Sequence, residues 1–442
     1  MTKLGVLTER AERYVDHVGQ QLQARSPRQI ADHIRGIVSA HESWRARCLN
    51  MNPAEGLMSD WCKEALATDF ATRLTEGAPG DKIYPHGAQN RYIDEVEAII
   101  IALLRRQYGA RFVEWRPISV NMANAAVFFS HLRRSDIVLS QAQEGGGNYS
   151  YHSNGIAGLT GAQIHPIPTS GNAFEIDLDL ARALTRRLRP KMIVIGGSSV
   201  LFPYPVRELR EIADECEAIL VYDAAHVGLL CWAGAFQRPL EEGAHVMTCS
   251  TVKVTGGPIG GIVLTNDADI AHRVGAVVFP ALLQKRDQNK YCALALSLAE
   301  MEQFGPTLAR QMVANAVALG AALQSSGIAV IGAERGFTRT HQLFLELGEG
   351  ARRFEEACQA ANILLSDCAL SGAGPWGARA GIRLGTHELT RLGMREPQMP
   401  AVAALMVRAF SGKHPERLRK EVLELRERFS SAMLAFDDTR ST

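Results

Sequence analysis

The sequence has few of the features that mark secreted, membrane or zinc-binding proteins. Its eight cysteines are scattered over 442 residues, with no Cys-x-x-Cys pair and no zinc-ligand spacing. No apolar run is long enough to cross a bilayer, and the N-terminal segment lacks the apolar core of a signal peptide. Charges nearly cancel, with 48 basic and 47 acidic residues. We therefore expect no metal site, no nucleic-acid or membrane partner and a cytoplasmic location.

What the chain does have is material for a large core, because 46% of its residues are hydrophobic. A chain of this length folds as two domains, or as one large and one small domain. Apolar residues recur at helical spacing over 15–22 and 30–44. We expect a helical arm over 1–60 that packs on a partner subunit or on the C-terminal domain. A large domain over 61–300 and a small domain over 301–442 should follow.

Between residues 110 and 265, short β-rich runs alternate with helical stretches. This alternation predicts an α/β fold, with a mostly parallel seven-stranded sheet and helices on both faces. Ligands bind beyond the carboxyl ends of such strands. The expected strands are 112–116, 137–139, 164–167, 192–195, 218–222, 246–249 and 261–264, and the expected helices are 94–108, 122–134, 178–188, 206–216 and 291–325. The small α+β domain should contain a strand at 343–346 and a loop at 371–377.

Three polar side chains follow two neighbouring predicted strands. Asp223 and His226 come directly after the run 219–222, and Lys253 follows the next strand, within the sequence STVKVTGGPIGG at 250–261. Pyridoxal-phosphate enzymes of the aminotransferase fold use this order. In them the Asp keeps the pyridine nitrogen protonated, and the Lys binds the cofactor aldehyde as a Schiff base and later acts as a base.

Each of these three residues has an ordinary structural explanation when it is considered alone. An isolated lysine at a strand–turn is usually exposed, an aspartate at a strand end often caps a helix, and a single histidine is often simply buried. Their combined order favours the cofactor site. The glycine pairs after Lys253 also leave room for a ring against the end of the sheet, and His226 could contact the phenolic oxygen of the cofactor.

Two further stretches suit the anionic groups of a cofactor and a substrate. The segment 115–124 ends a strand and opens a helix, so Ser119 and Asn121 could donate to a phosphate at the helix N-terminus. Arg383, in the Gly-flanked apolar run 381–386, could grip a substrate carboxylate with two hydrogen bonds. Alone, the first stretch is only a helix cap and the second only an exposed arginine.

Taken together, these motifs resemble serine hydroxymethyltransferase, a pyridoxal-phosphate enzyme of fold type I, over residues 45–400 in one order. Two stretches are more similar to the L-threonine transaldolase branch of that superfamily. The family motifs are Arg-Glu-Ile-Ala-Asp at 210–214, Asp-Ala-Ala-His-Val at 223–227, Ser-Thr-Val-Lys with Gly-Pro-Ile-Gly-Gly at 250–261, Gly-Ile-Arg-Leu-Gly-Thr at 381–386 and Thr-Arg-Leu-Gly-Met-Arg-Glu at 390–396, and the transaldolase-like stretches are 115–117 and 336–342.

The resemblance implies roles for five more residues. Ser198 corresponds to a serine near the phenolic oxygen of the cofactor, Ser250 also belongs to the cofactor site, and His341 to the substrate site. Glu76 corresponds to the acid–base glutamate and Tyr84, more loosely, to an active-site tyrosine. In this family the last two serve the site of the neighbouring subunit. The resemblance therefore implies a homodimer with shared active sites, alone or as a dimer of dimers.

Several positions depart from the family pattern. Asn148 stands where the family stacks a histidine on the cofactor ring, Val252 replaces the histidine before the lysine, and Leu74 replaces a tyrosine. The Asn-rich loop that grips the folate pterin is not recognisable within 365–377. These departures leave the use of folate open. Rings that could replace the missing histidine are those of Tyr149 and His152.

We expect an enzyme that breaks or forms the Cα–Cβ bond of a β-hydroxy-α-amino acid without folate, as an aldolase or a threonine transaldolase does. The resemblance implies an external aldimine and a quinonoid on pyridoxal 5'-phosphate, with Glu76 or a water as the base for the β-hydroxyl proton. Three alternatives stay open: a folate-dependent serine or α-substituted serine hydroxymethyltransferase, another reaction such as decarboxylation or transamination, and a non-catalytic homologue. Retention of Lys253, Asp223, His226 and Arg383 argues against the last.

Overall fold

The chain separates into two compact units in the computed structural model, Met1–Cys48 and Leu49–Thr442. The first unit contains the two helices that the apolar spacing predicted, α1 (Glu9–Leu22) and α2 (Pro27–Arg45). Ser26 caps α2 through a capping box with Gln29. The expected domain boundaries at residues 60 and 300 stay predictions. The structure describes residues 7–171, 174–370, 381–412 and 414–436.

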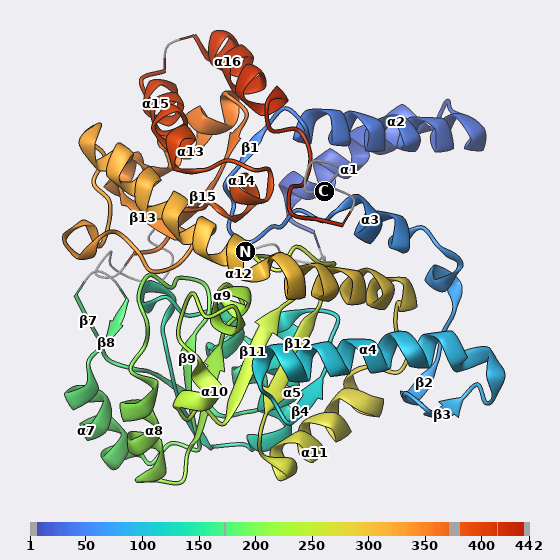
Figure 1. The fold of residues 1–442 in the computed structure, drawn as a ribbon, viewed down its shortest axis with the longest axis vertical. Coiled ribbons are helices and arrows are strands. Elements are labelled where there is room, and N and C mark those ends of the chain that lie inside the picture. Colours follow the sequence, from blue (N-terminus) through green and yellow to red (C-terminus); the bar gives the residue numbers. More distant parts are fainter. Residues whose placement is uncertain (1–6, 172–173, 371–380, 413, 437–442) are drawn as a thin grey trace. The chain divides into compact units, whose positions relative to one another are not determined.

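The second unit is built around the predicted seven-stranded sheet (Figure 1). From edge to edge its strands are β4 (Phe112–Glu114), β12 (Gly261–Thr265), β11 (Val246–Ser250), β10 (Ile219–Asp223), β9 (Met192–Gly196), β5 (Ile137–Ser140) and β6 (Gln163–Pro166). The strands from β11 to β6 are parallel, whereas β12 is antiparallel to both of its neighbours. All seven predicted strands and the mostly parallel α/β architecture are confirmed.

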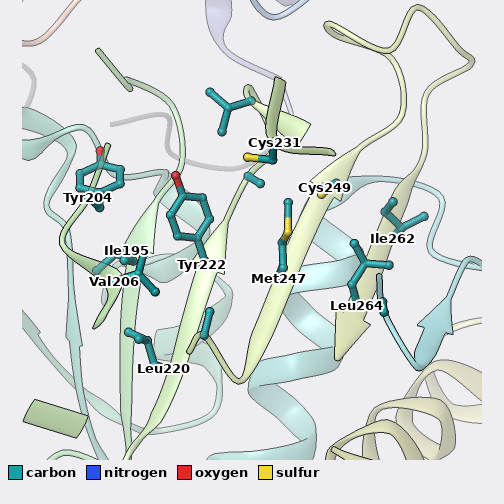
Figure 2. Packing of buried hydrophobic residues seen from close by; sticks show 14 of the residues in the cluster. Ile195, Tyr204, Val206, Leu220, Tyr222, Cys231, Met247, Cys249, Ile262 and Leu264 are labelled. Atoms are coloured by element: carbon teal, nitrogen blue, oxygen red, sulfur yellow. The ribbon is translucent and has the colours of Figure 1, made fainter. Parts of the chain in front are cut away.

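Helices cover both faces of this sheet, as a parallel sheet requires. They are α4 (Arg91–Tyr108), α7 (Leu178–Leu188), α8 (Val206–Asp214) and α12 (Gln288–Ser325) on one face, and α5 (Val120–His131), α6 (Ile156–Leu159) and α11 (Ala268–Ala276) on the other. Side chains alternate between two cores, so that along β9 Ile195 belongs to the first and Val194 to the second. Figure 2 shows Ile195, Leu220 and Met247 in the first core.

Two element ends near the sheet edge differ from the sequence prediction. Helix α5 begins at Val120 instead of residue 122, because Ser119 Oγ accepts a hydrogen bond from Met122 N (3.2 Å) and caps it. Strand β4 ends at Glu114 instead of residue 116, since Arg116 N donates to Glu114 Oε1 (3.0 Å) and not to a neighbouring strand. The strand-to-helix turn between β4 and α5 is therefore short, and it carries the predicted phosphate-binding residues.

A third core surrounds a three-stranded antiparallel sheet in the C-terminal part of the chain. It comprises β13 (Gln342–Glu346), β16 (Gly381–Gly385) and β15 (Ser366–Cys368), in that order, with α13 (Ala351–Ala360), α15 (Met399–Phe410) and α16 (Pro415–Glu427). Helix α12 contributes Leu319 and Leu323 to this core. The predicted long helix and the strand at 343–346 are confirmed. The predicted loop at 371–377 lies outside the described residues.

A hairpin of β2 (Glu76–Ala78) and β3 (Asp81–Tyr84) is linked to α4 by a buried ion pair. Lys82 Nζ lies 2.6 Å from Glu97 Oε2, and Arg286 lies 3.3 Å from the same carboxylate. In Figure 1 the hairpin lies beside α4.

No helix among the described residues is long and apolar enough to span a membrane. The remaining elements are β1 (Leu49–Asn50), α3 (Asp60–Leu66), β7 (Thr169–Ser170), β8 (Glu175–Ile176), α9 (Gly228–Trp232), α10 (Pro239–Glu242), β14 (Ile363–Leu364) and α14 (His387–Arg391).

Candidate active site

Asp223 ends the central strand β10 and is 1% exposed. Its Oδ1 accepts a hydrogen bond from Ala225 N (2.8 Å), and its Oδ2 accepts from Asn124 Nδ2 (3.0 Å) and from Tyr151 Oη (3.3 Å). Burial raises the pKa of Asp223, while these hydrogen bonds and the charge of Lys253 oppose that rise. The carboxyl group is thus held in one orientation at the end of the sheet, where a cationic N–H would favour its ionised form.

Asn124 and Tyr151, which hold this carboxylate, were not identified from the sequence. Asn124 lies in α5, and its Oδ1 accepts from Thr248 Oγ1 (2.8 Å), which directs its Nδ2 toward Asp223. Tyr151 is fully buried, and its single hydroxyl hydrogen is shared between Asp223 Oδ2 (3.3 Å) and the nearer Gly196 O (2.9 Å). The available signal was an asparagine flanked by Ala123 and Ala125 in a mostly apolar helix, because its partners lie far away in the sequence.

Lys253 lies in the turn after β11, at the same end of the sheet. Burial lowers its pKa to about 8, the charge of Arg383 acts in the same direction, and Asp223 opposes the shift. An amine with this pKa is substantially neutral near pH 8, as a nucleophile must be. Gly56 packs directly on the carbonyl oxygens of Val252 and Lys253, where a Cβ atom would overlap them. The turn that carries the lysine therefore depends on a glycine from a distant segment.

His226, His341 and His387 form a row of buried rings beside Lys253. The rings of His226 and His341 are nearly parallel, with centroids 6.3 Å apart, and His387 meets His341 edge-on at 5.1 Å. Burial lowers the pKa of all three rings, to about 4 for His387, and the charge of Lys253 lowers them further. The three rings are therefore neutral at neutral pH. Neither ring nitrogen of His341 has a hydrogen-bond partner among the described residues.

Arg383 lies in the middle of β16 and points its guanidinium toward the loop after β9. Its Nη1 donates to Ser198 O (2.9 Å), while its buried Nε has no partner among the described residues. Burial lowers the pKa of Arg383, although the group remains charged. Ser198 Oγ also accepts a hydrogen bond from Asn148 Nδ2 (3.1 Å). The structure thus brings together the predicted residues Ser198, Asn148 and Arg383.

The predicted phosphate-binding residues lie at the N-terminus of α5. Ser119 caps the helix, and Asn121 is exposed in its first turn. Gly261 packs against Ser119 O so closely that a Cβ atom would overlap it. Gly261 pairs in turn with Ser250, the buried last residue of β11. These contacts place the helix N-terminus beside the strand that leads to Lys253, and the phosphate-binding role stays a prediction.

Glu76 and Tyr84 are cross-strand partners in the β2–β3 hairpin. Tyr84 is 57% exposed. The hairpin contacts α4 through Lys82 and Arg286 through Gly77 O, and among the described residues no hydrogen bond or ion pair joins the side chain of Glu76 or Tyr84 to Lys253, Asp223 or Arg383. The expected sharing of sites between subunits stays a prediction.

The buried groups of this site fit pyridoxal 5'-phosphate. Asp223 is a fixed, buried carboxylate whose hydrogen-bond donors among the described residues are all neutral, and a protonated pyridine nitrogen supplies a cationic one. Lys253 provides an amine of lowered pKa for the aldehyde. The orphaned Nε of Arg383 provides a donor for an additional anion. The fold and these residues define a pyridoxal-phosphate-dependent enzyme of fold type I.

The chain belongs to the serine hydroxymethyltransferase family, whose family model matches residues 28–406. It is 33% identical over 426 residues to an α-methylserine aldolase from a Ralstonia species, covering 96% of this chain and 97% of the relative. It is 37% identical over 408 residues to the serine hydroxymethyltransferase of Methanopyrus kandleri, covering 90% and 94%. The structure of L-threonine transaldolase from Pseudomonas fluorescens shares the fold, with a TM-score of 0.86, 23% identity and 96% coverage of both chains.

Proposed function

We propose that this enzyme breaks or forms the Cα–Cβ bond of a β-hydroxy-α-amino acid without folate. The observation that carries the proposal is the proximity of Lys253 to both Asp223 and Arg383, since Asp223 raises the pKa of Lys253 and Arg383 lowers it. A nucleophilic amine, a ring-nitrogen partner and a carboxylate anchor are the three groups that amino-acid chemistry on pyridoxal 5'-phosphate requires.

When bound, the cofactor supplies an electron sink for the pair released from the broken bond. Asp223 keeps the ring nitrogen protonated, because its buried carboxylate gains a charge-assisted hydrogen bond from that N–H. Arg383 holds the substrate carboxylate and so determines which bond at Cα is presented for cleavage. Lys253, with its lowered pKa, would hold the cofactor aldehyde in the absence of substrate and, once free, would hold or move a proton at Nζ.

The proton of the β-hydroxyl group has to leave when the Cα–Cβ bond breaks. Glu76 of a second subunit, directly or through a water, is the carboxylate for this step, and Tyr84 lies opposite it in the same hairpin. The buried pair of Lys82 and Glu97 keeps the hairpin in place, so that the edge with the half-buried Glu76 and the exposed Tyr84 can face another chain. The functional unit is then a homodimer.

One comparison supports the absence of folate from the reaction. A relative that matches almost the whole chain is named an α-methylserine aldolase. An aldolase cleaves the substrate without a folate acceptor. The natural substrate class is then a serine or threonine analogue, including one with a substituent at Cα.

A folate-dependent serine hydroxymethyltransferase is the second candidate. It is favoured by relatives of that name, which include the Methanopyrus kandleri enzyme at 37% identity and the Pyrococcus abyssi enzyme at 35% identity over 425 residues. Both candidates use the same cofactor groups and differ in the acceptor of the one-carbon unit. An assay that varies only folate separates them.

The proposed function predicts amino-acid release without folate. Purified holoenzyme should be given L-serine, L-threonine or α-methylserine, each with and without tetrahydrofolate, and the released glycine or alanine and the aldehyde should be quantified. We expect release from at least one substrate at the same rate in both conditions. Release that depends strictly on tetrahydrofolate and occurs with serine would establish the second candidate instead. Absence of release from all three would contradict both.

Replacement Arg383→Lys should weaken substrate binding through loss of the two-pronged grip on the carboxylate. Hydrogen bonds to a charged group contribute about 1.5–3 kcal/mol, so KM for the amino acid should rise roughly 10- to 100-fold. Steady-state kinetics measure this change. Arg352→Lys, at a side chain that is 82% exposed, is the matched control and should leave KM unchanged. An unaltered KM in Arg383→Lys would remove Arg383 from the substrate site.

A further inference from the structure

Gln342, the first residue of β13, is fully buried beside the active site. Its Oε1 accepts a hydrogen bond from Val200 N (2.8 Å), and its Nε2 donates to Ser198 O (3.1 Å). A backbone N–H can only donate and a backbone carbonyl can only accept. These two backbone groups therefore determine the orientation of the side-chain amide, and exchange of its oxygen and nitrogen would break both bonds.

The second hydrogen on Nε2 of Gln342 faces His226 Nδ1 at 3.0 Å. Because the amide nitrogen can only donate, Nδ1 of the ring has to accept and cannot carry a hydrogen. A neutral His226 then carries its hydrogen on Nε2. The tautomer of a cofactor-site histidine is thus determined by backbone groups of the loop after β9, through one glutamine side chain.

The groups that face His226 from every neighbouring element favour its neutral form. They are Lys253 from the turn after β11, Arg383 from β16, His341 from the start of β13 and His387 from α14. Burial and these groups lower the pKa of His226 well below its usual value. The ring is neutral near pH 7, and its single hydrogen lies on Nε2, opposite the glutamine.

The same glutamine also reaches the predicted substrate anchor. Ser198 O accepts hydrogen bonds from both Gln342 Nε2 (3.1 Å) and Arg383 Nη1 (2.9 Å), which uses both lone pairs of that carbonyl. The glutamine, the serine carbonyl and the guanidinium therefore form one hydrogen-bonded unit. A substitution of Gln342 should therefore alter the hydrogen bonding of both His226 and Arg383.

We propose that Gln342 is a positioning residue of the active site: it holds His226 in the neutral form with hydrogen on Nε2, and it fixes the carbonyl that orients Arg383. His226 then presents an N–H donor to the phenolic oxygen of pyridoxal 5'-phosphate. The inference rests on the proposed function only for the identity of that acceptor. The tautomer and the orientation of Arg383 follow from the contacts of the chain itself.

Two near-isosteric variants test the proposal. In Gln342→Glu, one carboxylate oxygen can still accept from Val200 N, but the other meets His226 Nδ1 as an acceptor. The hydrogen should move to Nδ1, or the ring should become protonated. Gln342→Met retains the volume and removes the donor, so His226 should lose its single tautomer. Gln107→Met is the control. Gln107 is another buried glutamine and bonds to a backbone carbonyl outside the site, so this variant measures the general effect of replacing a buried amide with a thioether.

The first readout is ¹⁵N NMR of holoenzyme labelled at histidine, with His226→Asn to assign the signals. We expect hydrogen on Nε2 in the unsubstituted enzyme and on Nδ1 or on both nitrogens in Gln342→Glu. Hydrogen on Nδ1 in the unsubstituted enzyme would overturn the proposal, even if neither variant folds. This measurement requires no turnover, so a lack of activity toward β-hydroxy amino acids would count against the proposed function and not against the tautomer.

The second readout is the cofactor absorbance spectrum as a function of pH, recorded with steady-state kinetics. The spectral midpoint should shift in Gln342→Glu, because the donor to the phenolic oxygen is altered, and KM should rise about 10-fold, the effect of one lost hydrogen bond near a charge. Gln107→Met should change neither quantity. A Gln342→Glu enzyme with an unshifted midpoint and an unchanged KM would show that Gln342 has a packing role alone.

Discussion

The variant Lys253→Ala should lose at least about 10³-fold in kcat, because one residue supplies both the nucleophile for the cofactor aldehyde and a proton-transfer group. Burial holds the pKa of Lys253 at about 8, so its amine is available to react in the neutral form. The absorbance band of a lysine-bound cofactor should disappear from the purified variant. Single-turnover kinetics and the absorbance spectrum measure the two effects.

The matched control is Lys63→Ala, at an exposed lysine in α3 paired with Asp60 on the surface. This variant should retain the spectrum and the kcat of the unsubstituted enzyme. Hydride reduction followed by peptide mapping provides an independent check, since the cofactor should be recovered on the peptide with Lys253. Recovery on another lysine, or an active Lys253→Ala enzyme, would contradict the assignment of the site.

The variant Asp223→Asn should lower kcat by about 10²–10³-fold, the usual effect of removing one group that stabilises developing charge in a dry site. The neutral amide cannot keep the ring nitrogen protonated, so the electron sink is weakened while the substrate carboxylate is still held by Arg383. We therefore expect KM to change less than kcat. A rise in KM of about 10²–10³-fold with an unchanged kcat would assign Asp223 to substrate binding instead.

The same substitution, although it lowers kcat, should raise the unfolding free energy of the cofactor-free protein at higher pH. Burial raises the pKa of Asp223 above its value in the unfolded chain. The folded state therefore holds its proton to higher pH than the unfolded state, and this group destabilises the fold as pH rises from the ordinary pKa to the raised one. Above the raised pKa the cost is fully present. Asn at 223 removes the titration and with it this pH-dependent loss.

Urea unfolding of the cofactor-free protein at several pH values measures this effect. The difference in unfolding free energy between Asp223→Asn and the unsubstituted protein should move in favour of the variant as pH rises. Asp179→Asn, at an exposed aspartate in the first turn of α7, is the control and should show no such trend. A trend of the opposite sign would mean that hydrogen bonds from Asn124 and Tyr151 outweigh burial in the folded state.

The sheet could be predicted from sequence because parallel strands are buried on both faces. Each strand is then a short apolar run between helical stretches, as in Met192–Gly196, and all seven were located within a few residues. Lys253, Asp223 and Arg383 could be proposed as site residues because strand ends and Gly-rich turns carry characteristic local sequences. The start of α5 was displaced by two residues because a serine cap outweighed the apolar pattern.

The side chains that orient the site could not be predicted in the same way. Asn124 contacts Asp223 across 99 residues, and Gln342 contacts His226 across 116 residues. No local pattern marks such partners, because their role depends on which strand ends meet after folding. For the hairpin with Glu76 and Tyr84 the situation is reversed. Its motif is visible in the sequence, but the active site that it is proposed to serve lies on another chain.

The most direct test of the central claim is the fate of the Cα–Cβ bond in D₂O with folate-free holoenzyme and L-threonine or α-methylserine. The account predicts that each mole of released glycine or alanine carries one solvent deuteron at Cα and accompanies one mole of aldehyde. The stoichiometry follows because the broken Cα–Cβ bond is replaced by a bond to a proton from solvent. Formation of carbon dioxide or a keto acid, or deuterium uptake without aldehyde, would show that a different bond is broken and would contradict the account.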